Sequence, residues 1–261
     1  VFACAIAIDH HNVKGQYDAI QHAPSGALKC GTLLLVPNGV ATDSGLYMQN
    51  CTSEFAVAPA FDLRNVTEAS TLMSCRTTSH STGAPSPTPA FKLGGSDGTL
   101  NRISLVNCEA TTGSSQSEGL VIAPTGTQTV GTVKVMGCSF GGAVRGVDAN
   151  LGSTSSAVVI SDNIITGATA SNAMRIQNVS NTSGGLILCG NKTTAACALG
   201  VSLVNTPRCA VTGNTLYAAG GSGLLVTGTA APLVVGNVIR TSIDESGGGN
   251  SAQVYASNQF A

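Results

Sequence analysis

Short runs in which apolar and polar residues alternate recur along most of this chain. Alternation with a period of two is typical of a β-strand that buries one face. One series of such runs restarts every 23 to 30 residues. Its members are 61–65, 91–94, 120–123, 147–150, 174–178, 201–205 and 224–228, with an earlier copy at 33–38. These regular restarts predict many short strands that repeat one unit.

A second repeated feature is a column of cysteine and asparagine residues. In order they are Cys51, Cys75, Cys108, Cys138, Asn163, Asn191, Asn214, Asn237 and Asn258. An apolar residue commonly lies three positions before each of them. In most of the later copies another follows two positions after, as in Val211-Thr-Gly-Asn214-Thr-Leu216. Self-similarity at a period of about 20 to 50 residues is typical of solenoids.

Together these features predict an all-β fold, a single-stranded right-handed parallel β-helix (solenoid) of about nine coils. Two or three short strands in each ~25 residues, joined by turns, form one coil of such a solenoid. The strands often end in Asn or Gly, which tolerate the left-handed backbone of a corner. Identical amides on successive coils can form ladders along the axis. We therefore expect Cys138 and Asn163 to stack on adjacent coils, as one position that two residue types occupy.

The first part of the chain differs from the repeat. We assign residues 1–29 to an N-terminal capping segment and residues 30–261 to the parallel β-helix. A β-helix has an apolar open end and unpaired strand edges, and we expect a short amphipathic helix over residues 16–23 to cover them. No cap is visible at the C-terminal end, and the sequence begins without Met. We expect a processed chain or the ordered part of a longer one.

Composition and charge narrow the possible partners. Only 10% of the residues are charged and the net charge is −1. This balance gives no electrostatic basis for binding nucleic acid or an anionic membrane surface. The longest apolar run, residues 1–8, is too short to span a bilayer and lacks the features of a signal peptide. We therefore expect neither a nucleic-acid partner nor membrane insertion.

The nine cysteines form no CxxC and no paired Cys/His spacing that suggests zinc. We interpret them as free, buried thiols that act as small apolar residues. Because asparagine occupies the same column further along the chain, this position does not require a disulfide bond. We expect neither a metal site nor a required disulfide set. Free thiols imply folding in a reducing cytoplasm.

The alternating runs also predict an outward-facing column. Its residues are Asp62, Lys92, Val121, Asp148, Arg175, Ser202 and Leu225, with Arg64, Asn150 and Gln177 alongside. Asp148 and Arg175 should face each other about 5 Å apart along the axis. An ordinary surface ion pair, worth under about 1 kcal/mol, would explain them. The alternative is a carbohydrate-binding groove, with Asp148, Arg175, Asn150 and Gln177 as candidate ligand-binding residues.

Other motifs offer little chemistry. Residues 94–98 match GxSxG, but no helix follows to form a nucleophile elbow, and we expect a turn there. Asp9-His10-His11 could be metal ligands, but adjacent residues diverge on a strand, and His22 and His80 have no defined relation to them. We favour a capping or surface role for these histidines. We expect no metal and no cofactor.

Hydrolysis of a glycoside needs two carboxylates roughly 5 to 10 Å apart. Two pairs could share a face of the rod, Asp62 with Glu68 and Asp148 with Asp162, and we assign neither a catalytic role. The largest polar insertion into the repeat is the proline-rich segment 79–89. Insertions into a solenoid become loops, commonly on its binding side. This loop is therefore the first place to look for a partner contact, with a solvated spacer as the equal alternative.

The repeated apolar-x-Gly-Asn-x-apolar turn, as in 211–216 and 234–239, resembles the pectin-lyase-like right-handed parallel β-helix superfamily over about residues 30 to 260. Within it, the low charge, the Ser, Thr, Gly and Ala bias and the core cysteines look like those of bacteriophage tailspike or tail-fibre proteins. The resemblance implies a homotrimer in the virion tail that contacts other tail proteins. It also implies attachment, outside the cell, to a host surface polysaccharide.

The resemblance does not extend to catalytic residues. Polygalacturonase-type members carry Asn-x-Asp, Asp-Asp, Gly-His-Gly and Arg-Ile-Lys, and this chain offers only Arg175-Ile176-Gln177. The calcium-binding aspartate cluster of pectate lyases is missing as well. We therefore expect an attachment protein. A polysaccharide hydrolase or lyase is the first alternative, and a structural rod or adhesin is the second.

Overall fold

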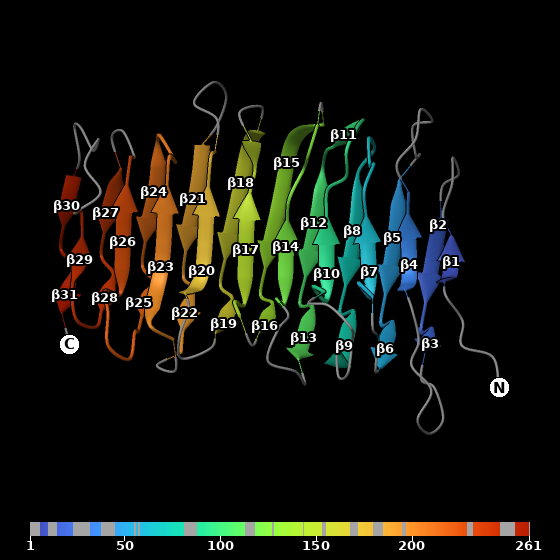
Figure 1. The fold of residues 1–261 in the computed structure, drawn as a ribbon, viewed down its shortest axis with the longest axis horizontal. Coiled ribbons are helices and arrows are strands. Elements are labelled where there is room, and N and C mark those ends of the chain that lie inside the picture. The colour runs from blue at the N-terminus through green and yellow to red at the C-terminus, as the bar shows by residue number, and fades with distance from the viewer. Residues whose placement is uncertain are drawn as a thin grey trace.

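The chain forms a solenoid of three parallel β-sheets, as seen in a computed structural model (Figure 1). The residues that it describes are 6–9, 15–22, 32–37, 45–54, 56, 58–80, 88–112, 118–126, 128–142, 144–152, 155–167, 172–179, 185–194, 197–228, 232–245 and 254–260. The colour in Figure 1 runs steadily from one end of the rod to the other, so each coil stacks on the one before it.

Each coil passes through the three sheets in turn. The first sheet contains β1 (Ile6–Asp9), β4 (Thr32–Val36), β7 (Phe61–Leu63), β10 (Phe91–Leu93), β14 (Leu120–Ile122), β17 (Val147–Asn150), β20 (Asn172–Gln177), β23 (Leu199–Val204), β26 (Leu224–Thr227) and β29 (Ile243–Asp244). The second contains β2 (Gly15–Asp18), β5 (Leu46–Gln49), β8 (Ser70–Met73), β12 (Ile103–Val106), β15 (Thr129–Met136), β18 (Ser155–Ser161), β21 (Gly185–Cys189), β24 (Cys209–Thr212), β27 (Leu233–Val235) and β30 (Val254–Ala256), and β11 (Thr99–Leu100) also pairs with β15. The third contains β3 (Gln21–His22), β6 (Thr52–Glu54), β9 (Arg76–His80), β13 (Glu109–Thr112), β16 (Ser139–Gly141), β19 (Ile164–Thr166), β22 (Lys192–Thr193), β25 (Thr215–Leu216), β28 (Val238–Ile239) and β31 (Gln259–Phe260).

This arrangement confirms the prediction of an all-β parallel solenoid. The count of about nine coils is not confirmed, because the three sheets hold ten, eleven and ten strands. That count rested on the cysteine and asparagine column, which has no member in the first coil. In that coil Ile20 occupies the column position, and its backbone carbonyl accepts a hydrogen bond from Thr52 N. Right-handed winding stays a prediction, favoured by the strong preference of parallel crossovers for that hand.

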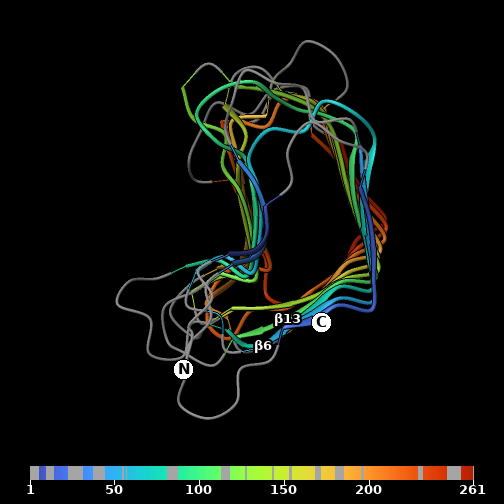
Figure 2. The ribbon, with the colours of Figure 1, turned by 90° about the vertical axis from the view of Figure 1, so that its right-hand side faces the viewer.

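The core is the space that the three sheets enclose, which the view along the rod shows end-on (Figure 2). Inward side chains of successive coils stack on one another there. Phe61 and Phe91 stack with their ring centroids 4.6 Å apart, and Phe140 meets Phe91 edge-on at 5.7 Å. All three rings are fully buried. Aromatic pairs of this kind contribute roughly 0.5 to 1.5 kcal/mol beyond the burial of their area.

The corner between the second and third sheets has the same backbone conformation in every coil. One residue with φ between 52° and 67° ends each strand of the second sheet: Ala19, Asn50, Ser74, Asn107, Gly137, Asp162, Gly190, Gly213, Gly236 and Ser257. This left-handed conformation costs a residue with a side chain about 1 to 2 kcal/mol, and glycine avoids that cost. The predicted Gly-Asn turns are therefore corners, with the column residue directly after the left-handed one.

The asparagines of the column form a continuous amide ladder along the rod. The Asn163 Nδ2 donates to Asn191 Oδ1 at 2.9 Å, and Asn191 Nδ2 donates to Asn214 Oδ1 at 3.0 Å. Each Oδ1 also accepts a backbone N–H from the coil before it, and each Nδ2 reaches a backbone carbonyl there, as Asn191 does with Ile160 O at 2.8 Å. Each buried amide thus satisfies backbone groups that the corner would otherwise leave unpaired.

The cysteines of the column make the same contacts with sulfur. Cys108 N donates to Cys138 Sγ at 3.3 Å, and the Cys138 thiol reaches Leu105 O at 3.6 Å. The sulfur accepts a hydrogen bond from a backbone N–H, as the asparagine Oδ1 does. The thiol also donates one to a backbone carbonyl, as the asparagine Nδ2 does. Cys138 N in turn donates to Asn163 Oδ1 at 2.8 Å. This contact confirms that Cys138 and Asn163 stack on adjacent coils.

The prediction of an N-terminal helix is wrong. The described residues of the segment 16–23 form β2, a two-residue corner and β3; the two strands pair with β5 and β6, and none of these residues is helical. In β2, Tyr17 packs against the core while Gln16 and Asp18 are exposed. In so short a segment the polar positions fit a period of two as well as a helical period, and parallel pairing decides between them. Residues of the segment 1–29 thus supply the first strand of each sheet.

The amide ladder predicts which asparagine side chains stabilise the fold. Asn191→Ala removes partners from Asn163 N, Ile160 O and the Asn214 amide, all in a buried corner. We expect it to lower the free energy of unfolding by about 2 to 5 kcal/mol, measured by urea unfolding. Asn191→Cys should lose less, since sulfur serves the same contacts elsewhere in the column. Asn150→Ala, which removes an exposed amide, is the control and should cost under about 1 kcal/mol; equal losses at both sites would contradict the role given to the ladder.

Candidate functional site

The outer face of the first sheet carries the column that the sequence predicts, although two of its members, Asp62 and Ser202, are buried. Strand register places Asp62, Lys92, Val121, Asp148, Arg175, Ser202 and Leu225 side by side on consecutive coils. The longer connections of the repeat lead into this sheet from the third sheet or out of it to the second, whereas the corner between the second and third sheets spans only two residues. The first sheet is therefore the face that lies between the variable segments of the solenoid.

Asp148 is the centre of a charged cluster on this face. Arg175 Nε donates to Asp148 Oδ1 at 2.9 Å and Arg175 Nη2 donates to Oδ2 at 2.6 Å, a bidentate pair across adjacent coils. Arg145, in the connection before β17, donates to the same Oδ2 at 3.2 Å. Asp148 keeps only 13% of its side chain exposed, against 33% for Arg175. The predicted facing of Asp148 and Arg175 is confirmed, as a partly buried and bidentate pair.

Glu118 completes the cluster from the connection before β14. Its Oε1 lies 3.9 Å from the Arg145 Nη1 that also contacts Asp148. The two carboxylates are therefore at most about 7 Å apart, an upper limit that falls among the carboxylate separations of glycosidases. Burial raises the pKa of Glu118 above its ordinary value, with a further contribution from the charge of Asp148 and opposition from Arg145. We call Glu118, Arg145, Asp148 and Arg175 the charged cluster.

The other two predicted ligand residues lie at the end of the same strands. Asn150 pairs in register with Gln177, two residues after the pairing of Asp148 with Arg175. Asn178 Nδ2 donates to Asn150 Oδ1 at 2.9 Å, and Asn205 Nδ2 donates to Asn178 Oδ1 at 3.2 Å. A second amide ladder therefore runs along the surface beside the cluster. The structure thus places Asp148, Arg175, Asn150 and Gln177 on two adjacent strands.

Neither carboxylate pair named from the sequence is assembled. Asp62 lies on the first sheet with its Oδ2 bound by Arg64 at 2.7 Å and its Oδ1 4.0 Å from Lys92 Nζ, whereas Glu68 lies in the connection to the second sheet. Asp162 is the left-handed corner residue between β18 and β19, on a different side of the rod from Asp148. The alternation of apolar and polar residues in the sequence does not tell on which side of the rod each acid lies.

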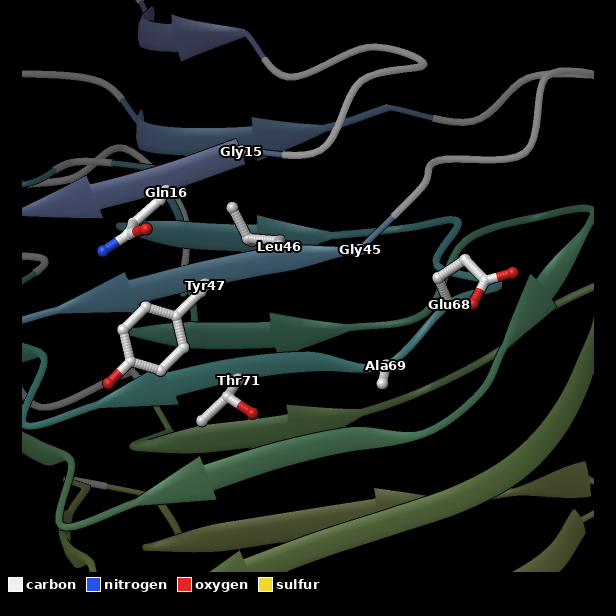
Figure 3. Close-up of a pocket in the computed structure, with 8 residues that line it drawn as sticks. All are labelled: Gly15, Gln16, Gly45, Leu46, Tyr47, Glu68, Ala69 and Thr71. Carbon is white, nitrogen blue, oxygen red and sulfur yellow. The ribbon is translucent and has the colours of Figure 1, made fainter.

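A separate depression of about 540 Å³ lies on the second sheet near the start of the rod. Figure 3 shows Gln16, Tyr47 and Thr71 on successive strands in its floor, with Glu68 to one side. Tyr47 is held in place because its hydroxyl donates to Gln49 Oε1 at 2.9 Å. An aromatic ring among polar groups is a surface on which a sugar ring could stack. The sequence pattern does not predict this depression, because its residues come from three coils with no shared motif.

The remaining motifs are structural or fall outside the described residues. Residues 94–98 form a turn, as predicted: Gly95 N donates to Gln128 Oε1 at 2.7 Å, and a Cβ on Gly94 would lie 2.7 Å from the backbone of Pro124. His10 and His11 are outside the described part, and so is most of the segment 79–89. Among the described residues, no group of three or more His, Cys, Asp or Glu side chains could hold a metal ion.

Sequence reasoning also missed Glu118 and Arg145, since neither lies on an alternating strand. Each lies two residues before the start of a strand of the first sheet, in a connection rather than in the repeat. One signal was available. In a chain with 10% charged residues, an acid and a base precede the strands that carry Val121 and Asp148, on neighbouring coils.

The raised pKa of Glu118 predicts how stability depends on pH. A carboxyl whose pKa is raised by folding contributes stability that is complete below the unfolded-state value and is lost as the pH rises through the folded-state value. Glu118→Gln keeps this side chain neutral at every pH. We therefore expect the free energy of unfolding of the variant, minus that of the wild type, to rise as the pH increases from about 4 to about 7. Urea unfolding at several pH values measures the difference; a flat or falling curve would contradict the buried carboxyl.

Comparison with known proteins adds no identification. No protein-family model matches this chain, and no curated protein matches it. No helix among the described residues is long and apolar enough to cross a membrane. The parallel solenoid and the charged cluster on its first sheet are therefore the basis for a functional proposal.

Proposed function

We propose that this chain is a virion appendage protein, like a tailspike or tail fibre, that recognises a bacterial host surface polysaccharide for attachment. The observation that carries the proposal is the charged cluster beside the surface amide ladder on the first sheet. The motif resemblance to pectin-lyase-like proteins supports the finer assignment within parallel solenoids. A homotrimer that joins other virion tail proteins follows from the same resemblance, and the mass of the native assembly tests it.

The chemistry of the first sheet suits sugar hydroxyls. A hydroxyl group both donates and accepts hydrogen bonds, so it can bind to a carboxylate and to a guanidinium or amide at the same time. Asp148, Arg175, Asn150 and Gln177 offer these groups on neighbouring strands. Because strands of consecutive coils are about 4.8 Å apart, the face presents polar groups at a regular interval along the axis. A polymer with repeated hydroxyls can follow such a track.

The rigidity of the site supports recognition by a preformed surface. Arg175 and Asp148 hold each other through two charge-assisted hydrogen bonds, and both stand on strands whose backbone is fixed on each side. Side chains that are already ordered lose little conformational entropy when a ligand binds. The connections on both edges of the sheet add further positions where contacts specific to one polysaccharide can arise.

Binding to an immobilised panel of bacterial lipopolysaccharides and capsular polysaccharides tests the proposal. We expect the wild type to bind at least one member, and Arg175→Ala to weaken that binding by about tenfold or more, because it removes charge-assisted hydrogen bonds from the surface. Arg76→Ala is the control: Arg76 also pairs with an acid on the adjacent coil, donating twice to Glu109 Oε2, but on the third sheet. It should leave the affinity unchanged.

Three outcomes would count against this placement. If no polysaccharide or host cell binds the wild type, the attachment function is lost and a structural rod or adhesin is favoured. Equal losses for Arg175→Ala and Arg76→Ala would mean a general effect of charge or folding. A third variant, Tyr47→Ala, decides between surfaces: if it abolishes binding while Arg175→Ala does not, the ligand lies in the depression of the second sheet. Circular dichroism checks that each variant is folded.

A second candidate function is hydrolysis of the same polysaccharide. The specific observation is that Glu118, with a raised pKa, and Asp148, bound by two arginines, face the same Arg145. A carboxyl whose pKa is raised can act as a general acid while a nearby carboxylate acts as base or nucleophile.

The polysaccharide bound in the first assay is the substrate to try for this second function. If the chain is a hydrolase, reducing ends should accumulate with the wild type and fall by about a hundredfold or more with Glu118→Gln or Asp148→Asn, while binding remains. Absorbance of unsaturated products would indicate a lyase instead. Binding with neither product would exclude catalysis on that polymer and leave attachment as the function.

A further inference from the structure

The cysteine half of the column places four thiols on four consecutive coils. Cys51, Cys75, Cys108 and Cys138 follow the same corner position, and all four are free and almost fully buried. The backbone between them is in register, because Glu109 N donates to Cys75 O and Ser139 N donates to Cys108 O, both at 2.9 Å. Cys108 N donates to Cys138 Sγ at 3.3 Å, and the Cys108 and Cys138 thiols reach Leu72 O at 3.3 Å and Leu105 O at 3.6 Å, each in the coil before. The result is a row of neighbouring sulfurs that the fold holds at the spacing of its coils.

That spacing disfavours a disulfide. A disulfide needs a sulfur–sulfur distance of about 2.05 Å and Cβ atoms about 3.5 to 4.5 Å apart. Side chains that point the same way from adjacent parallel strands are separated by about 4.7 to 4.9 Å. Bonding two of these sulfurs would therefore require neighbouring corners to approach one another by at least a few tenths of an ångström. The free thiols of the structure agree with this geometry.

The same spacing suits an ion held in a line between two sulfurs. Metal–thiolate bonds are about 2.3 Å long for zinc, so two collinear bonds of this kind span about 4.6 Å. Soft thiolate ligands favour soft ions such as copper(I). Linear coordination needs only two donors, so it does not require the convergence of three or more side chains that the described residues lack.

We propose that adjacent thiols of the column bind soft, linearly coordinating metal ions of the copper(I), silver(I) and mercury(II) class, with Cys108 and Cys138 as one bridging pair. Cys51 and Cys75 form the second pair. Since each thiolate joins one ion, the column takes one ion for each pair of thiols. The asparagine coils continue the same corner without sulfur, so the fold does not depend on the ion, and binding is an added property of this half of the rod.

Charge decides which ion of this class binds best. Two thiols that take up mercury(II) release two protons and form two metal–sulfur bonds, so the bis-thiolate complex is neutral. Copper(I) or silver(I) with two thiolates releases the same two protons and leaves one negative charge. An uncompensated charge is costly in an apolar core such as the one around Cys108 and Cys138. Mercury(II) is therefore the sharpest probe.

The test uses mercuric chloride, followed by an excess of a small monothiol. Mercury on a single cysteine should exchange onto the monothiol, while a bridged ion should remain. Native mass spectrometry of the wild type should then show one retained mercury per thiol pair, each with the loss of two protons. X-ray absorption should show two sulfur neighbours and no third. Circular dichroism should show that the β-structure is unchanged.

The chain itself supplies matched variants. Cys138→Asn extends the amide ladder by one coil, as Asn163 already does beside it, so it should fold and retain one mercury fewer. Cys209→Ser removes a buried thiol outside the column and should retain as much as the wild type. The proposal is overturned if Cys138→Asn and the wild type retain the same amount, if both variants lose mercury equally, if disulfides form instead, or if retention requires loss of the β-structure.

Discussion

The structure depends on one constraint, the need to satisfy backbone hydrogen bonds at the corner between the second and third sheets. Each coil turns there through a left-handed residue, and the next residue points into the core. Asparagine at that position bonds a backbone N–H, a backbone carbonyl and the next amide at once: the Asn214 side chain accepts from Asn191 N at 2.9 Å and donates to Leu188 O at 3.0 Å and to Asn237 Oδ1 at 2.9 Å. An unmet donor or acceptor in this place would cost about 1 to 3 kcal/mol in every coil. The repeated corner therefore fixes the register of the whole rod.

Fixing one corner leaves the other two free to vary. The connections into and out of the first sheet change in length from coil to coil, while the corner of the second and third sheets keeps its two residues. Glu118 and Arg145 enter the site from such connections, whereas Asp148 and Arg175 stand on strands whose register the corner sets. The charged cluster thus combines fixed and variable parts of the repeat. A solenoid can in this way change its ligand without changing its scaffold.

The sequence predicted those features that a period reveals. The strands, the column of Cys138 and Asn163, and the facing of Asp148 and Arg175 all follow from alternation and spacing. It did not predict β2 and β3, because in a segment as short as 16–23 polar positions fit two periods and only pairing with β5 and β6 decides. It also missed Glu118 and the Tyr47 depression, since residues between repeats have no period that places them. Tertiary contacts, which have no local pattern, determine those positions.

The charged cluster has a composition that favours a neutral ligand. Arg175 uses two of its N–H donors on Asp148, and guanidinium carries about five, so donors remain for a ligand while the charge is already balanced. An anionic sugar would have to compete with Asp148 for Arg175 and would lie near Glu118 as well. Hydroxyl groups need no such exchange, because they accept from the remaining donors and donate to carboxylate lone pairs. The cluster therefore provides hydrogen-bond direction rather than net charge, and a rod with net charge −1 can bind without relying on long-range attraction.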